Sequence, residues 1–195
     1  MTRTIAHTTP YAWPWDGAYS PSRTALLVVT VPGVPPPGAD VEALARALRP
    51  AGGVVVHVTT APPRADRQTV GTAVGTAVGT AVETWGSTDS RVDHRVESAG
   101  VDGFFGSPLD GLLRSLGRDQ LLLTGAWLET GVHSTMRSAN DRGYECLLVL
   151  DACTAYDPDL VAASRSQIEM SGGIFGAVGS TDDVLAALDS ERTHP

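Results

Sequence analysis

The chain has 195 residues, which suits one α/β domain that buries roughly 70% of the surface its unfolded form would expose. Its 22 acidic and 14 basic residues, the latter all arginine, give a formal charge of -8. No basic patch is evident, so we expect neither nucleic acid nor an anionic membrane surface as a partner. An apolar content of 42% argues against general disorder.

An arm rich in proline and aromatic residues is expected at 1–23, ahead of a single α/β domain at 24–190. Trp13 and Trp15 are too large and apolar to remain in water, so the arm should pack on the domain or on a second subunit. No apolar leader precedes it, and no run approaches the ~20 apolar residues of a membrane helix. We expect a soluble, cytoplasmic protein with Cys146 and Cys153 as free, buried thiols.

Six short apolar runs predict six β-strands separated by helical segments. Strands that are apolar on both faces are typical of a parallel sheet covered on both sides. We therefore expect an α/β fold with one doubly wound, Rossmann-like, six-stranded, mainly parallel sheet and helices on both faces. The expected strands are 24–31, 53–59, 91–96, 120–124, 145–150 and 174–178.

Helices are predicted between these strands from apolar spacing and end signals. The expected helices are 40–48, 110–116, 129–141, 155–170 and 181–188. Candidate buried positions of the fourth helix are Leu160, Val161, Ala163 and Ile168. The repeat VGTAVGTAVGTAV at 70–82 favours a short helix, with a loop as the alternative because glycine and threonine are poor helix formers. His57, in the second strand, is expected to be a packed, hydrogen-bonded side chain rather than a ligand.

The stretch from Asp119 to Cys153 predicts a strand, a tight turn, a helix and a second strand. In parallel sheets ligands bind beyond the carboxyl ends of the strands, so the turn at 125–131 should line a pocket. Its backbone N–H groups, at the start of a helix, are candidate donors to an anion or a carbonyl.

The same stretch, GAWLETGVHSTMRSANDRGYECLLVLDAC, resembles the nucleophile segment of the isochorismatase-like cysteine hydrolases. That family has a turn of the form G-x-x-T-D-x-C-V, a helix, and an A/N-x-R-G-Y/F ending before the next strand. Counting back from DRGY at 141–144 places the family's nucleophilic cysteine at Gly131.

Two further segments resemble the family. TALLVVTV is similar to its first strand, whose terminal aspartate is the general base, and this position is Thr30. VESAGVDGFFGSPLDGLL is similar to the segment that carries the catalytic lysine, and the lysine position is Ser98. A slip of one residue would give Glu97 or Ala99, and the chain contains no lysine. PYAWPWDG resembles the leader of one bacterial branch of the family.

The resemblance implies the family's fold with a degenerate triad of Thr30, Ser98 and Gly131. Threonine is not a base near neutral pH, serine carries no charge and glycine has no side chain, so we expect cysteine-hydrolase activity to be absent. Isochorismatases proper resemble this chain in having glycine at the cysteine position, but they retain the aspartate and the lysine.

Any remaining acid–base chemistry would need a substitute acid. Glu129, two residues before Gly131, is the best candidate, and Glu97 and Asp102 are weaker ones. The alternative role for Glu129 is a carboxylate that stabilises the start of the helix. The candidate pocket-lining residues are Trp127, Leu128, Phe104 and Phe105, with core packing as the alternative for the two phenylalanines.

Two classes of function follow from these residues. The first is a pseudoenzyme, acting as a small-molecule-binding or structural subunit, alone or with an active paralogue. The second is a repurposed enzyme of a specialised pathway that uses non-covalent acid–base or template catalysis. We expect no cofactor and no metal, because the Asp and two His of the family's metal-binding subgroup are not matched. The family's assembly through its helices, together with the aromatic arm, favours a homo-oligomer.

Overall fold

The computed structural model describes residues 3–34, 38–61, 83–84 and 93–193, and it contains one sheet in the strand order β3-β4-β2-β1-β5-β6-β7. The strands are β1 (Thr24–Thr30), β2 (Val54–Thr59), β3 (Glu83–Thr84), β4 (His94–Glu97), β5 (Gln120–Ala126), β6 (Glu145–Thr154) and β7 (Ala177–Gly179). Every pairing from β4 to β7 is parallel, and only the two-residue β3 at the edge is antiparallel. The predicted doubly wound, six-stranded parallel sheet is therefore confirmed.

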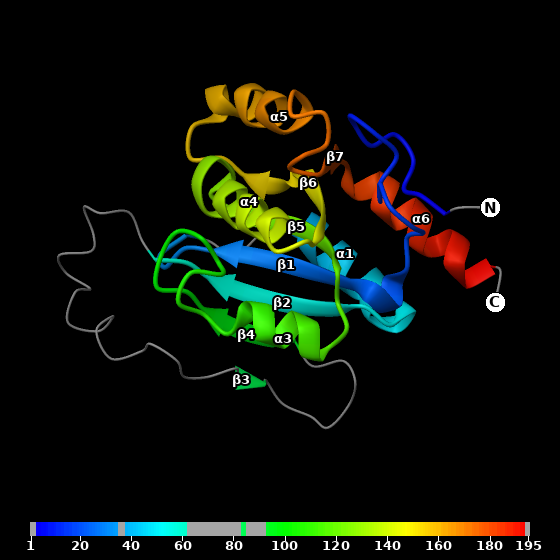
Figure 1. Ribbon diagram of the computed structural model, residues 1–195, viewed down its shortest axis with the longest axis horizontal. Helices are drawn as coiled ribbons and strands as arrows, with labels where there is room; N and C mark the ends of the chain where they lie inside the picture. The colour runs from blue at the N-terminus through cyan, green and yellow to red at the C-terminus, as the bar shows by residue number, and fades with distance from the viewer. Residues whose placement is uncertain (1–2, 35–37, 62–82, 85–92, 194–195) are drawn as a thin grey trace.

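The helices cover both faces of the sheet (Figure 1). The α-helices are α1 (Ala39–Leu48), α3 (Leu109–Ser115), α4 (His133–Asp141), α5 (Val161–Glu169) and α6 (Thr181–Thr193). A π-helix, η4 (Leu128–Val132), runs directly into α4, and single 3-10 turns form η1 (Pro21–Arg23), η2 (Arg49–Ala51) and η5 (Pro158–Leu160).

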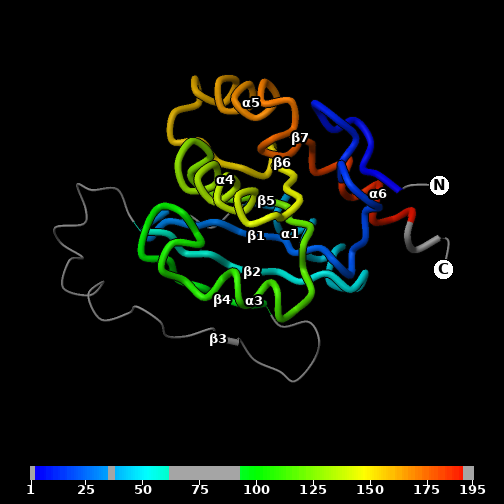
Figure 2. The backbone as a smooth tube through the Cα atoms, in the orientation of Figure 1, coloured from blue at the N-terminus to red at the C-terminus, as the bar shows by residue number. Residues whose placement is uncertain are grey.

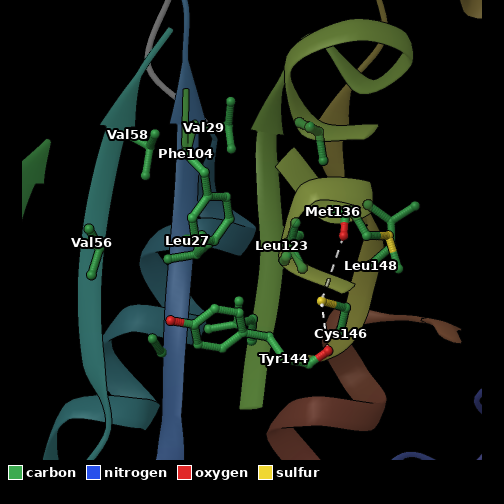
Figure 3. Packing of buried hydrophobic residues seen from close by; sticks show 14 of the residues in the cluster. Leu27, Val29, Val56, Val58, Phe104, Leu123, Met136, Tyr144, Cys146 and Leu148 are labelled. Carbon is green, nitrogen blue, oxygen red and sulfur yellow. Dashed lines mark hydrogen bonds between the residues drawn. The ribbon is translucent and has the colours of Figure 1, made fainter. Parts of the chain in front are cut away.

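Alternate residues of each strand point to opposite faces and build two cores. On one face Leu27, Val29 and Leu123 pack against α3, α4 and α5. Figure 3 shows this core close up, with Phe104 and Tyr144 over β1. On the other face Leu26 and Val28 pack against α1, α6 and the N-terminal arm. Both cores depend on β1 and β5, which lie at the centre of the sheet and are fully buried over most of their length.

The arm packs on the domain, as one of the two sequence-based alternatives predicted. Trp13 is fully buried in the second core, and the backbone of Thr9 exchanges two hydrogen bonds with Val178, of 2.9 and 2.7 Å. The arm therefore covers the outer edge of β7 and lies beside α6 (Figure 2). Trp15, in contrast, is 70% exposed.

The C-terminal third differs from the sequence prediction at two elements. The last strand is 177–179 rather than 174–178, because Gly172, Gly173 and Gly176 take positive φ angles of 63°, 100° and 104° that strands do not use. Ile174 is accordingly 72% exposed.

The helix predicted at 155–170 is a loop at 155–157, the turn η5 and the shorter α5. Asp157 caps η5, and Pro158 occupies the first position of that turn. Leu160 and Ala163, predicted to be buried, are exposed, whereas Ile168 is buried as predicted.

Two predictions fall partly or wholly outside the described residues. The repeat at 70–82 lies outside them, and so do the first two residues of the strand predicted at 91–96. Within the described part of the chain, no helix has the length and apolar character that crossing a bilayer requires.

Candidate functional site

The crevice expected in this topology lies where β1 and β5 are neighbours. From β1 the chain proceeds to β2 and β4 on one side, and from β5 it proceeds to β6 and β7 on the other. At such a switch point the loops diverge beyond the carboxyl ends of the two central strands and leave room for a ligand. Thr30 ends β1 and Ala126 ends β5, so the site is built by the residues that follow them (Figure 1).

The end of β5, directly before the turn, requires glycine at position 125. Gly125 has φ +111°, and a Cβ atom there would lie 1.9 Å from the carbonyl oxygen of Val29. This close approach holds the end of β5 against β1. The Ala126–Trp127 peptide that follows is cis, and Trp127 O then accepts from the N–H groups of Thr130 and Val132 as η4 begins.

The three triad positions inferred from the family resemblance lie together. Thr60 donates from its N–H and its Oγ1 to the carbonyl oxygen of Thr30, at 2.8 and 3.1 Å. Ser98 donates its N–H to Thr59 O at 2.9 Å, and the hydroxyls of Thr30 and Thr59 are 3.4 Å apart. A Cβ atom on Gly131 would lie 3.4 Å from Thr60 Oγ1. The pair Thr59–Thr60 therefore connects Thr30, Ser98 and Gly131.

Sequence analysis missed Thr59 and Thr60. The signal that would have found them is the pairing register, because Thr30 lies directly opposite Thr59 in the parallel ladder between β1 and β2. A third residue that was not predicted is Thr135, whose buried hydroxyl donates to Gly131 O at 2.7 Å and accepts from Gly103 N–H at 2.9 Å. It ties the first turn of α4 to the loop after β4.

Glu129 has two backbone partners in the loop after β6. One carboxylate oxygen accepts from Asp157 N–H at 2.8 Å and the other from Tyr156 N–H at 3.0 Å. Of the weaker candidate acids, Asp102 accepts from the N–H of Phe104 at 2.9 Å, and Glu97 is exposed on β4. The carboxylate of Glu129 thus holds a loop in place.

The four candidate pocket-lining residues occupy different environments. Leu128 and Phe104 are buried in the first core, where Phe104 packs on Tyr144 with ring centroids 5.8 Å apart (Figure 3). Phe105 is 62% exposed. Trp127 is half-buried and makes an edge-to-face contact with Tyr156, at 5.4 Å between centroids. These side chains do not form one aromatic wall.

Neither cysteine is placed to act as a nucleophile. Burial raises the pKa of the Cys146 thiol, whose nearest polar atoms are the carbonyl oxygens of Tyr144 and Met136 (Figure 3). Cys153 is partly exposed, and its thiol faces Val149 O at 3.3 Å. Both thiols are free, as predicted, although only Cys146 is fully buried.

His57 is a packed, hydrogen-bonded side chain, as predicted. Its Nε2 lies 3.2 Å from the Asp93 carboxylate, which also receives two hydrogen bonds from the Arg49 guanidinium. Across the described residues, no group of three or more His, Cys, Asp or Glu side chains is arranged to hold a metal ion.

The sheet order and the turn at its switch point define a doubly wound α/β protein with a candidate site at the carboxyl edge. The isochorismatase domain family matches residues 29–183, and the chain belongs to the isochorismatase family.

Solved structures agree with this assignment. The chain is similar to a cysteine hydrolase from Pseudomonas syringae pv. phaseolicola 1448A, with a TM-score of 0.66 and 20% identity over 89% of this chain and 95% of that one. It is similar to an isochorismatase family protein from Burkholderia thailandensis, with a TM-score of 0.63 and 28% identity over 86% of this chain and 96% of that one. It is also similar to a nicotinamidase from Staphylococcus aureus, with a TM-score of 0.57 and 16% identity over 82% of this chain and 99% of that one.

Proposed function

We propose that this protein binds a small molecule at the carboxyl edge of β1 and β5 and does not act as a cysteine hydrolase. The observation that carries the proposal is the composition of the cluster around Thr59 and Thr60. Its members at the family's reactive positions are Thr30, Ser98 and Gly131, which supply two hydroxyl groups and no carboxylate, amine or thiol.

Amide hydrolysis through a thiolate needs a nucleophile, a base to deprotonate it, and donors for the developing oxyanion. The backbone of Gly131 does not require glycine, because its φ lies outside the left-handed region and a Cβ atom there would meet only close van der Waals contacts. A Cβ atom at this position requires only a small shift of the Val29 side chain, which supports loss of the chemistry rather than a conformational need for glycine. The hydroxyl of Thr30 has only long contacts, of 3.4 Å with Val58 O and Thr59 Oγ1, so it suits hydrogen bonding to an uncharged polar ligand. Ser98 Oγ donates to Gly100 O at 2.7 Å and retains its capacity to accept.

A repurposed enzyme that uses Glu129 as its acid is the less supported function. Both carboxylate oxygens of Glu129 already accept backbone N–H groups of the loop after β6, so the side chain is engaged in holding that loop. A general acid must instead lie within hydrogen-bond reach of the substrate atom that it protonates.

The proposal is tested with the purified protein and a panel of small amides, carboxylic acids and enol ethers that includes nicotinamide. We expect no ammonia release and no enol-ether cleavage, together with a rise in melting temperature for at least one compound. Thr30→Val, which replaces a hydroxyl by a methyl group, should reduce that rise. Turnover by the wild-type chain that is lost in Glu129→Gln would replace the binding function with the enzymatic one.

We also propose that the protein forms a homo-oligomer through the face around α5. Exposed apolar side chains gather on the segments that flank this helix, and surfaces of this kind are typical of interfaces. They are Tyr156, Leu160, Met170 and Ile174. Light scattering after size-exclusion chromatography measures the mass directly, and a monomer over the whole concentration range would exclude the assembly.

A further inference from the structure

A hollow lies beyond the carboxyl ends of β6 and β7, and none of Thr30, Ser98 and Gly131 is among its lining residues. It begins where the pairing of β6 and β7 ends, at Val149 and Gly179, and has a volume of about 390 Å³. This volume falls in the range of small-molecule sites. Its apolar wall consists of Leu150, Val161 and Val178.

The N-terminal arm closes one side of this hollow. The side chain of His7 lines it and lies 2.9 Å from the Asp183 carboxylate on α6. Two residues further on, Thr9 donates its hydroxyl to Glu169 on α5 at 2.5 Å. The arm thereby contacts both α5 and α6, and His7 forms part of the rim of the hollow.

The polar lining includes a cationic group with unused donors. Nε of Arg165 donates to Glu169 Oε1 at 2.7 Å, the same oxygen that accepts from Thr9. A guanidinium has five N–H donors, and its two terminal nitrogens have no hydrogen-bond partner among the described residues. The bond from Nε to Glu169 constrains the orientation of the guanidinium, whose side chain is about half exposed.

The same lining includes a carboxylate with unused acceptor capacity. Asp151 Oδ1 accepts from Thr181 N–H at 2.8 Å and from Thr181 Oγ1 at 3.0 Å. Its Oδ2 has only a longer contact, of 3.1 Å, with that same N–H. The other acidic residue, Asp183, already has His7 and Ser180 as partners. The start of α6 is likewise occupied by Asp151, so this hollow is not an anion site at a helix terminus.

We propose that this hollow binds an aliphatic α-amino acid. The ligand's carboxylate would pair with the terminal nitrogens of Arg165, its ammonium group with Asp151 Oδ2, and its side chain with the apolar wall. A simple anion would be repelled by Asp151 and Asp183, and a simple cation would be repelled by Arg165. A molecule that carries both charges satisfies both groups.

Binding is measured by titration calorimetry on the full chain, with L-leucine, isoamylamine, which lacks the carboxylate, and isocaproate, which lacks the ammonium. We expect L-leucine to bind, and each analogue to bind at least about tenfold more weakly, since one charge-assisted contact is lost. Arg165→Gln should weaken L-leucine at least about tenfold and should not weaken isoamylamine, since the charge that repels a cation is removed.

The complementary variant is Asp151→Asn, which retains an oxygen to accept from Thr181. It should weaken L-leucine and isoamylamine but not isocaproate, and Arg46→Gln, on α1, should change none of the three affinities. If Arg165→Gln fails to fold, Arg165→Lys should retain L-leucine binding. The proposal is overturned if no aliphatic amino acid binds, if the three ligands bind equally, or if either charge-removing variant binds L-leucine as the wild type does.

Discussion

The carboxylate of Glu129 accepts a hydrogen bond from the backbone N–H of Asp157 at 2.8 Å. A second bond, from Tyr156 N–H at 3.0 Å, runs in parallel with it. Together they join η4, at the start of the helix that follows β5, to the loop that follows β6. The edge-to-face contact between Trp127 and Tyr156 lies in the same place, and Tyr156 is otherwise 74% exposed. Glu129 therefore fixes the geometry of this loop.

Glu129→Ala is expected to lower the free energy of unfolding by about 1–2 kcal/mol, because two N–H groups lose a charged acceptor at a half-buried position. Glu129→Gln, with one acceptor oxygen, should cost roughly half as much. Urea unfolding measures both values. Glu97→Ala, at an exposed position, is the control and should stay within about 0.5 kcal/mol of the wild type. An equal loss in the two alanine variants would contradict the bridging role of Glu129.

Gly125, near the end of β5, and Gly131, in η4, are expected to differ in how strongly substitution destabilises the protein. Gly125→Ala should destabilise the protein by more than about 3 kcal/mol, because its Cβ would lie 1.9 Å from Val29 O at a φ of +111°. Gly131→Ala should cost at most about 1–2 kcal/mol, since its nearest neighbour, Val29 Cγ1 at 3.2 Å, is a side-chain atom that can shift. Thermal and urea unfolding compare the pair.

The same position tests the chemistry of the site. Gly131→Cys should fold yet leave the new thiol unactivated, because Thr30 and Ser98 supply neither a base nor a positive charge. Alkylation by iodoacetamide at neutral pH should be slow, and adding Thr30→Asp and Ser98→Lys should accelerate it. Rapid alkylation of the single variant would mean that another group activates a thiol there.

Prediction from the sequence succeeded where one periodicity decides the structure. The run LLVV at 26–29 is buried on both faces, and such a run fits only a central strand of a parallel sheet. Prediction failed where two adjacent residues of the same type point into different environments because of the loop conformation. Phe104 is in the core and Phe105 in solvent, because a tight turn closed by Phe105 N–H on Asp102 O reverses the chain between them.

Part of the candidate site was predictable for the same reason, and part was not. Thr30 ends β1 and Gly131 lies in the turn after β5, so their meeting at one sheet edge follows from parallel order. Thr59 and Thr60 depend on the register of β2 against β1, which hydrophobic pattern alone does not define to one residue. The partners of Glu129 depend on a loop 27 residues away in the sequence, and no local pattern encodes that contact.

The ion pair between Arg49 and Asp93 predicts a pH dependence of stability. Burial opposes ionisation of Asp93, but hydrogen bonds from Arg49 and His57 outweigh it and lower the pKa of the carboxyl group. The pKa of an aspartate in the unfolded chain is about 3.9, and the folded-state pKa of Asp93 lies below it. The ionised carboxylate therefore stabilises the fold above about pH 3.9, and this stabilisation is lost as the pH falls through the folded-state pKa. Asp93→Asn should therefore cost about 1–2 kcal/mol at neutral pH and progressively less below about pH 4.

Urea unfolding at neutral pH and at about pH 3 measures this difference. The matched control is Asp119→Asn, which removes the pair of Asp119 with Arg23, two side chains that are each about half exposed. Exposed pairs contribute little, so this change should cost less than about 1 kcal/mol at either pH. A cost for Asp93→Asn that stays constant from neutral to acid pH would refute the linkage.

The arm offers a final contrast between two tryptophans two residues apart. Trp13 is fully buried in the core beneath α1 and α6, and its ring lies 5.9 Å from that of Tyr19. Trp15 is exposed, and its ring centroid lies 5.1 Å from that of Tyr11 in an edge-to-face contact. Trp13→Ala should lower the free energy of unfolding by about 3–5 kcal/mol, and Trp15→Ala by about 1 kcal/mol or less. Similar small losses in both variants would mean that burial of Trp13 does not anchor the arm on the domain.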